Sequence, residues 1–345
     1  MKRYLSNFLT PPSTEVSPFL AAENQLTICN GTNPSYKLGT LIKDLGYTKV
    51  GSTLQAGEKV TGLHHFRQSS SVNNILATIN NTTPGANLTL QYNNAGTWTA
   101  INVGSTYNGF EDTITDFEDF LGYCFIVGYD ATDNVFLPCA SLTTTTFSTS
   151  TNVTSMPQGK YIKRYRDRLY VANCFITATA YPYRVYYSSV PSASTITWTV
   201  ASDFIDVDYS EQITGIAENW DRLIIFTEFS AYMYDQASKK KVWDVGCGNH
   251  FTIQNLGATM IWANKDNVWA STGGKPEPIG NDIFELIRTS TPSNWRSAVI
   301  DNEYNLYLGS SVSANGIAYT NCLVTLNMFT GMWRWRELYD NVTSL

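Results

Sequence analysis

The sequence predicts an all-β protein: a β-propeller of six or seven four-stranded blades, with a slight preference for seven. Three observations carry this prediction. A motif of polar turn and apolar strand recurs along the chain, its strands are apolar on both faces, and the composition favours strands over helices. Charged residues make up only 15% of the 345 residues and aromatic residues 13%, including 21 tyrosines, which is typical of β-rich chains.

The recurring motif is clearest in residues 166–173 (RDRLYVAN) and 219–227 (NWDRLIIFT), and four further copies follow the same pattern. The residues at the start of the six apolar strands are separated by 49, 45, 54, 45 and 38 positions: Asn74, Tyr123, Arg168, Arg222, Asn267 and Asn305. A repeat of about 40–50 residues is the length of one propeller blade. Stepping back by the same interval predicts a seventh copy near Gln25.

Each copy extends into four expected strands. First strands are predicted at 60–66, 114–120, 160–166, 213–219, 258–264 and 296–302. A third strand follows the motif, as at 184–190, and a tryptophan often marks the fourth strand: Trp98, Trp198, Trp243 and Trp333. Four strands per repeat match one blade. Only residues 281–289 look helical.

The second strands, such as residues 223–226 (LIIF), are apolar at every position. Blades stacked face to face explain this pattern, because both sides of an inner strand are then buried. A β-sandwich would not produce one regular period over the whole chain. We therefore expect an N-terminal arm at residues 1–15 and a single propeller domain at 16–345.

Composition also limits the function. A net charge of −6 and an isoelectric point near 5.1 argue against a protein that grips nucleic acid with its whole surface. The N-terminus lacks the continuous apolar run of a signal peptide, and no apolar segment is long enough to predict a membrane span. Six cysteines without a CxxC pair are expected to be reduced and mostly buried: Cys29, Cys124, Cys139, Cys174, Cys247 and Cys322.

A basic, tyrosine-rich stretch, residues 160–173, is the first candidate site. Its cations are Lys160, Lys163, Arg164, Arg166 and Arg168, which have the chemistry to contact DNA phosphates or an acidic partner. Strand alternation, however, sends the cations to both faces, so a solvated hairpin at a blade edge is the preferred interpretation. Four residues are predicted to close turns between strands, since Asp and Asn bond their own backbone there: Asp167, Asp221, Asn267 and Asn305.

Metal and catalytic sites have little support. Adjacent His64 and His65 should point to opposite faces of a strand, and the Cys247 to His250 pair lacks a second pair at ligand spacing, so no metal site is predicted. The acidic run 202–211 lacks the glycine and the terminal glutamate of a calcium loop. The chain contains no nucleophile-elbow, phosphate-loop or dinucleotide motif. We expect no cofactor and no enzymatic activity.

Five segments carry a family resemblance: residues 17–51, 165–173, 184–198, 213–235 and 273–283. Together they resemble the β-propeller virion proteins of tailed bacteriophages, of the tail-hub, nozzle and packaged-DNA-stabilisation type. The resemblance covers most of the chain and brings no catalytic residue with it. It implies a structural subunit of the tail or neck, assembled in the host cytoplasm and located in the virion.

The same resemblance implies the partners: copies of this chain in a ring around or below the DNA channel, and other tail, adaptor or portal proteins. DNA would pass without sequence-specific binding, and a net-acidic chain would keep the conduit from holding phosphates. The alternative is a carbohydrate-binding propeller that recognises host surface glycans. Its stacking platforms would be Trp98, Trp198, Tyr183 and Tyr187, although the tryptophans are explained equally well as packing between outer strands.

Overall fold

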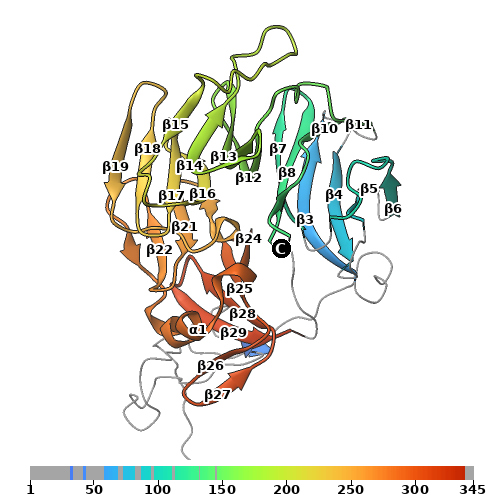
Figure 1. Ribbon diagram of the computed structural model, residues 1–345. Coiled ribbons are helices and arrows are strands. Elements are labelled where there is room, and N and C mark those ends of the chain that lie inside the picture. The colour runs from blue at the N-terminus through green and yellow to red at the C-terminus, as the bar shows by residue number, and fades with distance from the viewer. Residues whose placement is uncertain are drawn as a thin grey trace, which may run out of the picture. The chain divides into compact units, whose positions relative to one another are not determined.

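The computed structural model describes residues 32–33, 42–43, 58–68, 73–81, 87–94, 97–110, 113–131, 133–143 and 146–338. The chain is a β-propeller, and its described residues form six four-stranded blades, numbered here in chain order (Figure 1). The predicted fold class is confirmed. The expected seventh copy near Gln25 and the arm of residues 1–15 lie outside the described residues.

Two compact units divide the chain, and residues 49–244 form the larger one with four blades. Blade 1 consists of β3 (Glu58–Arg67), β4 (Asn73–Asn81), β5 (Thr89–Asn94) and β6 (Thr97–Ile101). Blade 2 consists of β7 (Thr113–Phe120), β8 (Tyr123–Asp130), β10 (Ala140–Leu142) and β11 (Phe147–Ser148), with β9 (Val135–Phe136) also paired to β8. Blade 3 consists of β12 (Gln158–Tyr165), β13 (Arg168–Ile176), β14 (Thr179–Tyr187) and β15 (Phe204–Asp206). Blade 4 consists of β16 (Ile213–Asn219), β17 (Arg222–Thr227), β18 (Ala231–Tyr234) and β19 (Lys239–Trp243).

The other unit contains residues 245–343 and 1–48, and its described part holds two blades. Blade 5 consists of β20 (Gln254–Leu256), β21 (Thr259–Ala263), β22 (Val268–Ser271) and β23 (Glu277–Pro278). Blade 6 consists of β24 (Arg296–Ile300), β25 (Glu303–Gly309), β28 (Cys322–Asn327) and β29 (Met332–Glu337). Short elements complete the unit: β1 (Thr32–Asn33) with β2 (Ile42–Lys43), β26 (Val312–Ala314) with β27 (Ile317–Tyr319), three 3-10 turns (His250–Thr252, Asn281–Ile283, Pro292–Asn294) and α1 (Phe284–Thr289). The helical expectation for 281–289 is confirmed.

Blade 5 differs from the predicted strand order. Residues 258–264 were expected to be its first strand, but β21 is the second strand and β22 the third. The true first strand, β20, is the short polar sequence Gln-Asn-Leu before the turn at Gly257. β20 lacks the run of apolar residues that marks strands elsewhere in the chain. In addition, the turn before β22 has the same sequence pattern as the turns that precede the second strands of the other blades.

Three of the four tryptophans expected in fourth strands lie there: Trp98 in β6, Trp243 in β19 and Trp333 in β29. The expectation for Trp198 is wrong. This residue lies in the segment between β14 and β15 and forms only an isolated bridge with Ser188. Its ring is buried, 6% exposed, and its Nε1 donates to the carbonyl of Asn152 at 3.2 Å, so packing rather than strand pairing explains the residue.

The second strands are buried as predicted. In β17, the four residues Leu223, Ile224, Ile225 and Phe226 all have 0% exposure. Separate apolar clusters fill the junctions of blades 1 and 2, 2 and 3, 3 and 4, and 5 and 6. Two side-chain amides add matching bonds across junctions: Asn80 Nδ2 donates to the carbonyl of Thr113, and Asn173 Nδ2 to that of Ile213.

The described cysteines are all free, and four of the five are buried, which confirms the prediction for Cys124, Cys139, Cys174, Cys247 and Cys322. The cysteine at position 29 lies outside the described residues. In the described part of the chain, no helix has the length and hydropathy needed to cross a bilayer.

Gly62 lies where blades 1 and 2 pack closely, and a methyl group there should weaken the fold. A Cβ on Gly62 would lie 2.0 Å from Thr115 Oγ1 and 2.7 Å from both Phe117 Cε2 and Thr78 Oγ1. We expect Gly62→Ala to lower the free energy of unfolding by about 1–3 kcal/mol, the usual cost of overpacking. Urea denaturation followed by tryptophan fluorescence measures it.

The matched control is Gly274→Ala, where an added Cβ meets nothing within 4 Å. It should leave stability unchanged or raise it slightly, because alanine restricts the unfolded chain. Equal unfolding midpoints for the two variants would contradict the close contact at Gly62.

Candidate functional site

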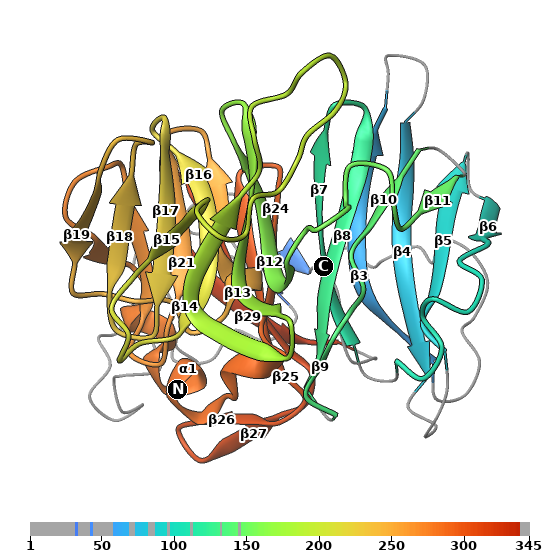
Figure 2. The same ribbon diagram turned by 45° about the horizontal axis from the view of Figure 1, so that its top comes forward.

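The basic hairpin of β12 and β13 is held by contacts within the chain. Lys160 Nζ lies 3.8 Å from the ring centre of Tyr129, and the Arg164 guanidinium lies 5.4 Å from that of Phe120. Both aromatic partners belong to blade 2, whose β7 lies beside β12 in Figure 2. Cation–π contacts of this geometry stabilise an exposed cation by about 0.5–1 kcal/mol.

Lys163 makes the strongest of the contacts to blade 2. Its Nζ is 2.7 Å from Glu118 Oε2, and one residue earlier the Ile162 N–H donates to Asp116 Oδ2 at 2.8 Å. Burial acts to lower the pKa of Lys163, but Glu118 and Asp116 outweigh it and the pKa is raised. Burial also raises the pKa of Glu118, although Lys163 opposes that shift. This lysine is therefore a structural cation.

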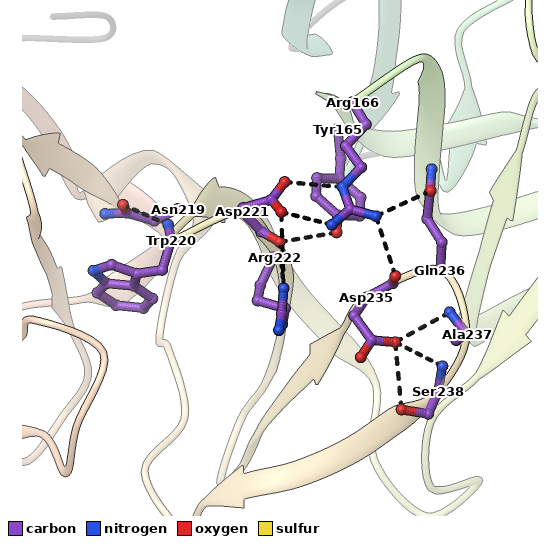
Figure 3. Close-up of polar contacts among 10 residues, drawn as sticks. All are labelled: Tyr165, Arg166, Asn219, Trp220, Asp221, Arg222, Asp235, Gln236, Ala237 and Ser238. Atoms are coloured by element: carbon purple, nitrogen blue, oxygen red, sulfur yellow. Dashed lines mark hydrogen bonds and ion pairs between the residues drawn. The ribbon is translucent and has the colours of Figure 1, made fainter.

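Arg166 faces the other neighbour, blade 4, and Figure 3 shows its partners converging on the guanidinium. Its Nε and Nη2 donate to the two carboxylate oxygens of Asp221 at 2.8 and 2.6 Å. Nη1 donates to Gln236 Oε1 at 3.2 Å and to the Asp235 carbonyl at 3.4 Å. A bidentate arginine–carboxylate pair fixes both distance and plane, so this exposed pair links the turns of two blades.

Arg168 completes the set of five basic residues. Its Nη1 donates to the carbonyl of Ser188 at 2.9 Å, and its guanidinium lies 5.1 Å from the ring centre of Tyr187. Each of the five cations thus has a partner inside the chain. The excess charge of the hairpin meets acidic and aromatic groups of blades 2 and 4, while Arg164 and Arg166 remain at the surface.

The four predicted turn residues have different roles. Trp220 and Asp221 form a two-residue turn with φ of 51° and 54°, as a type I′ hairpin requires, but the Asp221 carboxylate binds Arg166. Asp167 also lies in a two-residue turn, and its carboxylate accepts from Gln236 Nε2 at 3.2 Å. Both positions are confirmed as turns, yet their side chains bond to other elements.

Asn267 lies in the predicted turn, between β21 and β22, although its side chain does not close that turn, and the prediction for Asn305 is wrong. Asn264 closes the turn before β22, because its Oδ1 accepts from the N–H groups of Asp266 and Asn267. Asn267 instead anchors a later loop through the Gly280 N–H at 2.7 Å. Asn305 lies inside β25, where its Oδ1 accepts from Thr325, and the turn there consists of residues 301–302.

The proposed glycan platforms do not form one surface. Trp98 lies on the outer strand of blade 1, whereas Tyr183 and Tyr187 lie on β14 of blade 3. Buried Trp198 has no face open to a sugar, so its assignment as a platform is wrong. The ring of Tyr187 is covered by the Arg168 guanidinium. Tyr183 is the proposed platform residue whose ring lies beside an exposed aromatic residue, Tyr209.

A small pocket lies where the loops of blades 3 and 4 meet. Its volume is about 290 Å³, and its lining residues are Pro182, Tyr209, Ser210, Glu211, Gln212, Glu228 and Phe229. Tyr209 and Phe229 are 69% and 65% exposed. The ring of Tyr183 meets that of Tyr209 edge to face, with centroids 4.5 Å apart. This aromatic and acidic pocket is the candidate binding site.

Sequence reasoning missed the pocket. β15 ends at Asp206, which pairs with Arg184 Nε at 2.5 Å. Asp208 then bonds the N–H and hydroxyl of Ser210 and turns the chain. The sequence did show two polar loops that each carry an aromatic residue, Tyr209 and Phe229. Whether the two loops lie close together depends on how the blades pack.

The carboxylate of Asp221 offers a direct test of the junction in Figure 3. Its hydrogen bonds with Arg166 hold the pKa of Asp221 below its usual range. We expect Arg166→Met to raise that pKa toward the ordinary value, as measured by a carboxyl NMR titration. Arg222→Met is the control, because Arg222 is 3.9 Å from the same carboxylate and should change the pKa less.

The sign of the stability effect follows from the same shift. Because the pKa of Asp221 is lower in the folded state, its ionised carboxylate stabilises the fold. This stabilisation is fully present above the unfolded-state pKa and is lost as the pH falls through the folded-state pKa. Loss of Arg166 should therefore reduce stability more near neutral pH than in strong acid, where only its bonds to Gln236 and to the Asp235 carbonyl are lost. An unchanged Asp221 titration in Arg166→Met would contradict the pairing.

No protein-family model matches the chain, and no curated protein matches it in sequence. Among solved structures, the chain is similar to PorZ, described as an essential bacterial surface component of the type-IX secretion system of Porphyromonas gingivalis. The identity is 13% and the TM-score 0.43 over 85% of this chain. The chain is also similar to the N-terminal domain of Nup159, with 11% identity and a TM-score of 0.37 over 66% of this chain. The matched regions span 40% and 61% of those two chains.

Proposed function

We propose that the chain is a non-enzymatic propeller subunit of a tailed-phage particle, in the tail or neck, that acts through protein contacts. The phage assignment rests on the five sequence segments that resemble virion propellers. One structural observation supports a contact role: Tyr209 and Phe229 expose 69% and 65% of their surface on adjoining loops. Aromatic residues are enriched at the cores of protein interfaces.

The exposure and bonding of the pocket residues favour a macromolecular contact over a buried small ligand. Ligand pockets usually bury most of the surface of a small ligand, whereas Tyr209 and Phe229 line this pocket with 69% and 65% exposure. The Glu211 carboxylate is already bonded to the hydroxyls of Thr227 and Ser230. It holds the loop of Phe229 in place, so the exposed aromatic pair is presented on an ordered surface.

We take the occupant to be a second copy of this chain, as the resemblance implies. The pocket carries Glu211 and Glu228, and the outer strand β19 exposes the consecutive side chains Lys239, Lys240 and Lys241. An acidic, aromatic surface and a basic strip on the same chain are complementary. Contacts between two different patches of one chain generate rings when the rotation closes.

Removing the exposed aromatic pair should weaken assembly. In native mass spectrometry, the full chain should form a discrete ring, and the double variant Tyr209→Ser with Phe229→Ser should shift to monomer. The loss follows because the interface would no longer bury two large aromatic surfaces. The control is Phe329→Ser, since Phe329 is 82% exposed in blade 6 and its loss should leave the ring intact.

A wild-type chain that stays monomeric at all concentrations would contradict the assembly proposal. Circular dichroism and thermal unfolding check that the double variant is folded. Since both side chains are exposed, we expect the fold to be unaffected.

Carbohydrate recognition is the second candidate, and the same pocket supplies the observation that favours it. Tyr209 lines the pocket with the carboxylates and amide of Glu211, Gln212 and Glu228, and the ring of Tyr183 meets that of Tyr209 edge to face. Aromatic faces stack on sugars, and such polar groups accept from hydroxyls. In this case the monomer should bind one glycan class on an array, and Tyr209→Ser should abolish the signal. Failure of every glycan to bind would overturn this alternative.

A further inference from the structure

Three side chains of metal-ligating types meet at the junction of blades 1 and 2, apart from the pocket described above. His64 belongs to β3, Asp119 to β7 and Cys124 to β8. Their ligand atoms all lie within 4.8 Å of one another, and His64 Nε2 is 2.8 Å from Asp119 Oδ1. In the part of the chain that the structure describes, no other group of three or more His, Cys, Asp or Glu side chains gathers this closely.

The β7–β8 hairpin positions two of the three groups. Asp119 pairs directly with Cys124, and Phe120 pairs with Tyr123 next to the two-residue turn. The turn residues Leu121 and Gly122 have φ of 55° and 78°, which is the type I′ geometry. Directly opposed residues project to the same face of an antiparallel pair. The turn therefore holds the carboxylate and the thiol side by side.

The neighbouring blade supplies the imidazole, and surrounding groups orient it. The His64 ring stacks on Phe117 with centroids 5.6 Å apart and an interplanar angle of 11°. The second oxygen of Asp119 accepts from the backbone N–H of Arg67 at 3.3 Å. Outer contacts of this kind set the direction of metal ligands.

Burial leaves one side of the group accessible. Cys124 is 0% exposed, whereas the side chains of His64 and Asp119 are 24% and 31% exposed. An ion would thus reach the thiol from the side of the imidazole and carboxylate. Three protein ligands with one open position is the arrangement of a four-coordinate zinc site completed by water.

We propose that His64, Asp119 and Cys124 bind a Zn²⁺ ion, with water as the fourth ligand, and so link blade 1 to blade 2. Tetrahedral bonds of zinc length require the His64 Nε2 to Asp119 Oδ1 separation to widen from 2.8 Å to about 3.3 Å. The sulfur ligand favours zinc over Mg²⁺ or Ca²⁺, which take oxygen ligands. As the Zn–S bond forms, the proton of the Cys124 thiol leaves to solvent, and the proton on His64 Nε2 is replaced by one on Nδ1, so that the imidazole binds as the neutral ring.

This site is independent of the proposed contact function. The sequence prediction of no metal considered His64 together with His65, which alternate across the strand. The actual partners come from the next repeat, 55 and 60 positions away. A plain His64–Asp119 hydrogen bond is the competing explanation, and it requires no metal affinity.

The experiment uses the full chain after treatment with a chelator. Isothermal titration with ZnCl₂ should give one ion per chain, and Co²⁺ should produce a thiolate-to-cobalt charge-transfer band. His64→Gln and Asp119→Asn should each weaken Zn²⁺ binding by more than about 10-fold, since even outer-shell changes cost about 10- to 100-fold. His65→Gln and Cys174→Ser are controls that should bind as the wild type does.

Absence of saturable Zn²⁺ binding to the wild type, or equal affinity in His64→Gln, would overturn the proposal. Cys124→Ser should remove the cobalt charge-transfer band. If that buried variant does not fold, the two exposed ligand variants still decide the result, with thermal unfolding as a second readout. Zn²⁺ should raise the melting temperature of the wild type and leave that of His64→Gln unchanged.

Discussion

The second strand of a blade is apolar on both faces, and this constraint shapes the rest of the molecule. In β17, the residues from Leu223 to Phe226 lose all contact with solvent. Burying a side chain of this type stabilises the fold by roughly 1.5–3 kcal/mol, but a lone four-stranded sheet would leave both of its faces in water. A repeat of this kind needs neighbours on both sides. Blade stacking is therefore the condition under which the strands are stable.

Stacking brings backbone carbonyls and polar side chains to the blade junctions, where they must be paired. Asn80 and Asn173 supply amide donors to the first strand of the next blade, and the Tyr165 hydroxyl donates to the carbonyl of Asp221. Each bond works in only one alignment of the two blades. The apolar clusters hold the blades together, and these polar bonds determine their register.

The same junctions also contain the charged side chains that could otherwise bind an external ligand. Lys163 meets Glu118 on one side of blade 3, and Arg166 meets Asp221 on the other. A basic stretch that resembles a phosphate site in the sequence is thus used to connect blades. The loops at the opposite ends of the strands expose Tyr209 and Phe229. Contacts with other molecules are more compatible with that surface than with the hairpin.

The sequence by itself determined the propeller class, the four-strand repeat, the reduced cysteines and the short helix, because each depends on local pattern. The two-faced apolar strand is visible within each repeat, and the period is visible when the repeats are compared. It did not reveal that blade 5 begins with the polar strand β20, or that Trp198 packs outside a strand, since neither segment has a distinctive pattern.

Tertiary structure alone decided the partners. Arg166 lies 55 positions from Asp221, and His64 lies as far from Asp119, so no spacing within a repeat relates them. These pairs exist because consecutive blades dock with one register. The pocket of Tyr209 and Phe229 depends on the same docking, because its two loops leave different blades. The sequence shows which side chains can form ion pairs or bind ligands, whereas the packing of the blades determines which of those side chains lie close to one another.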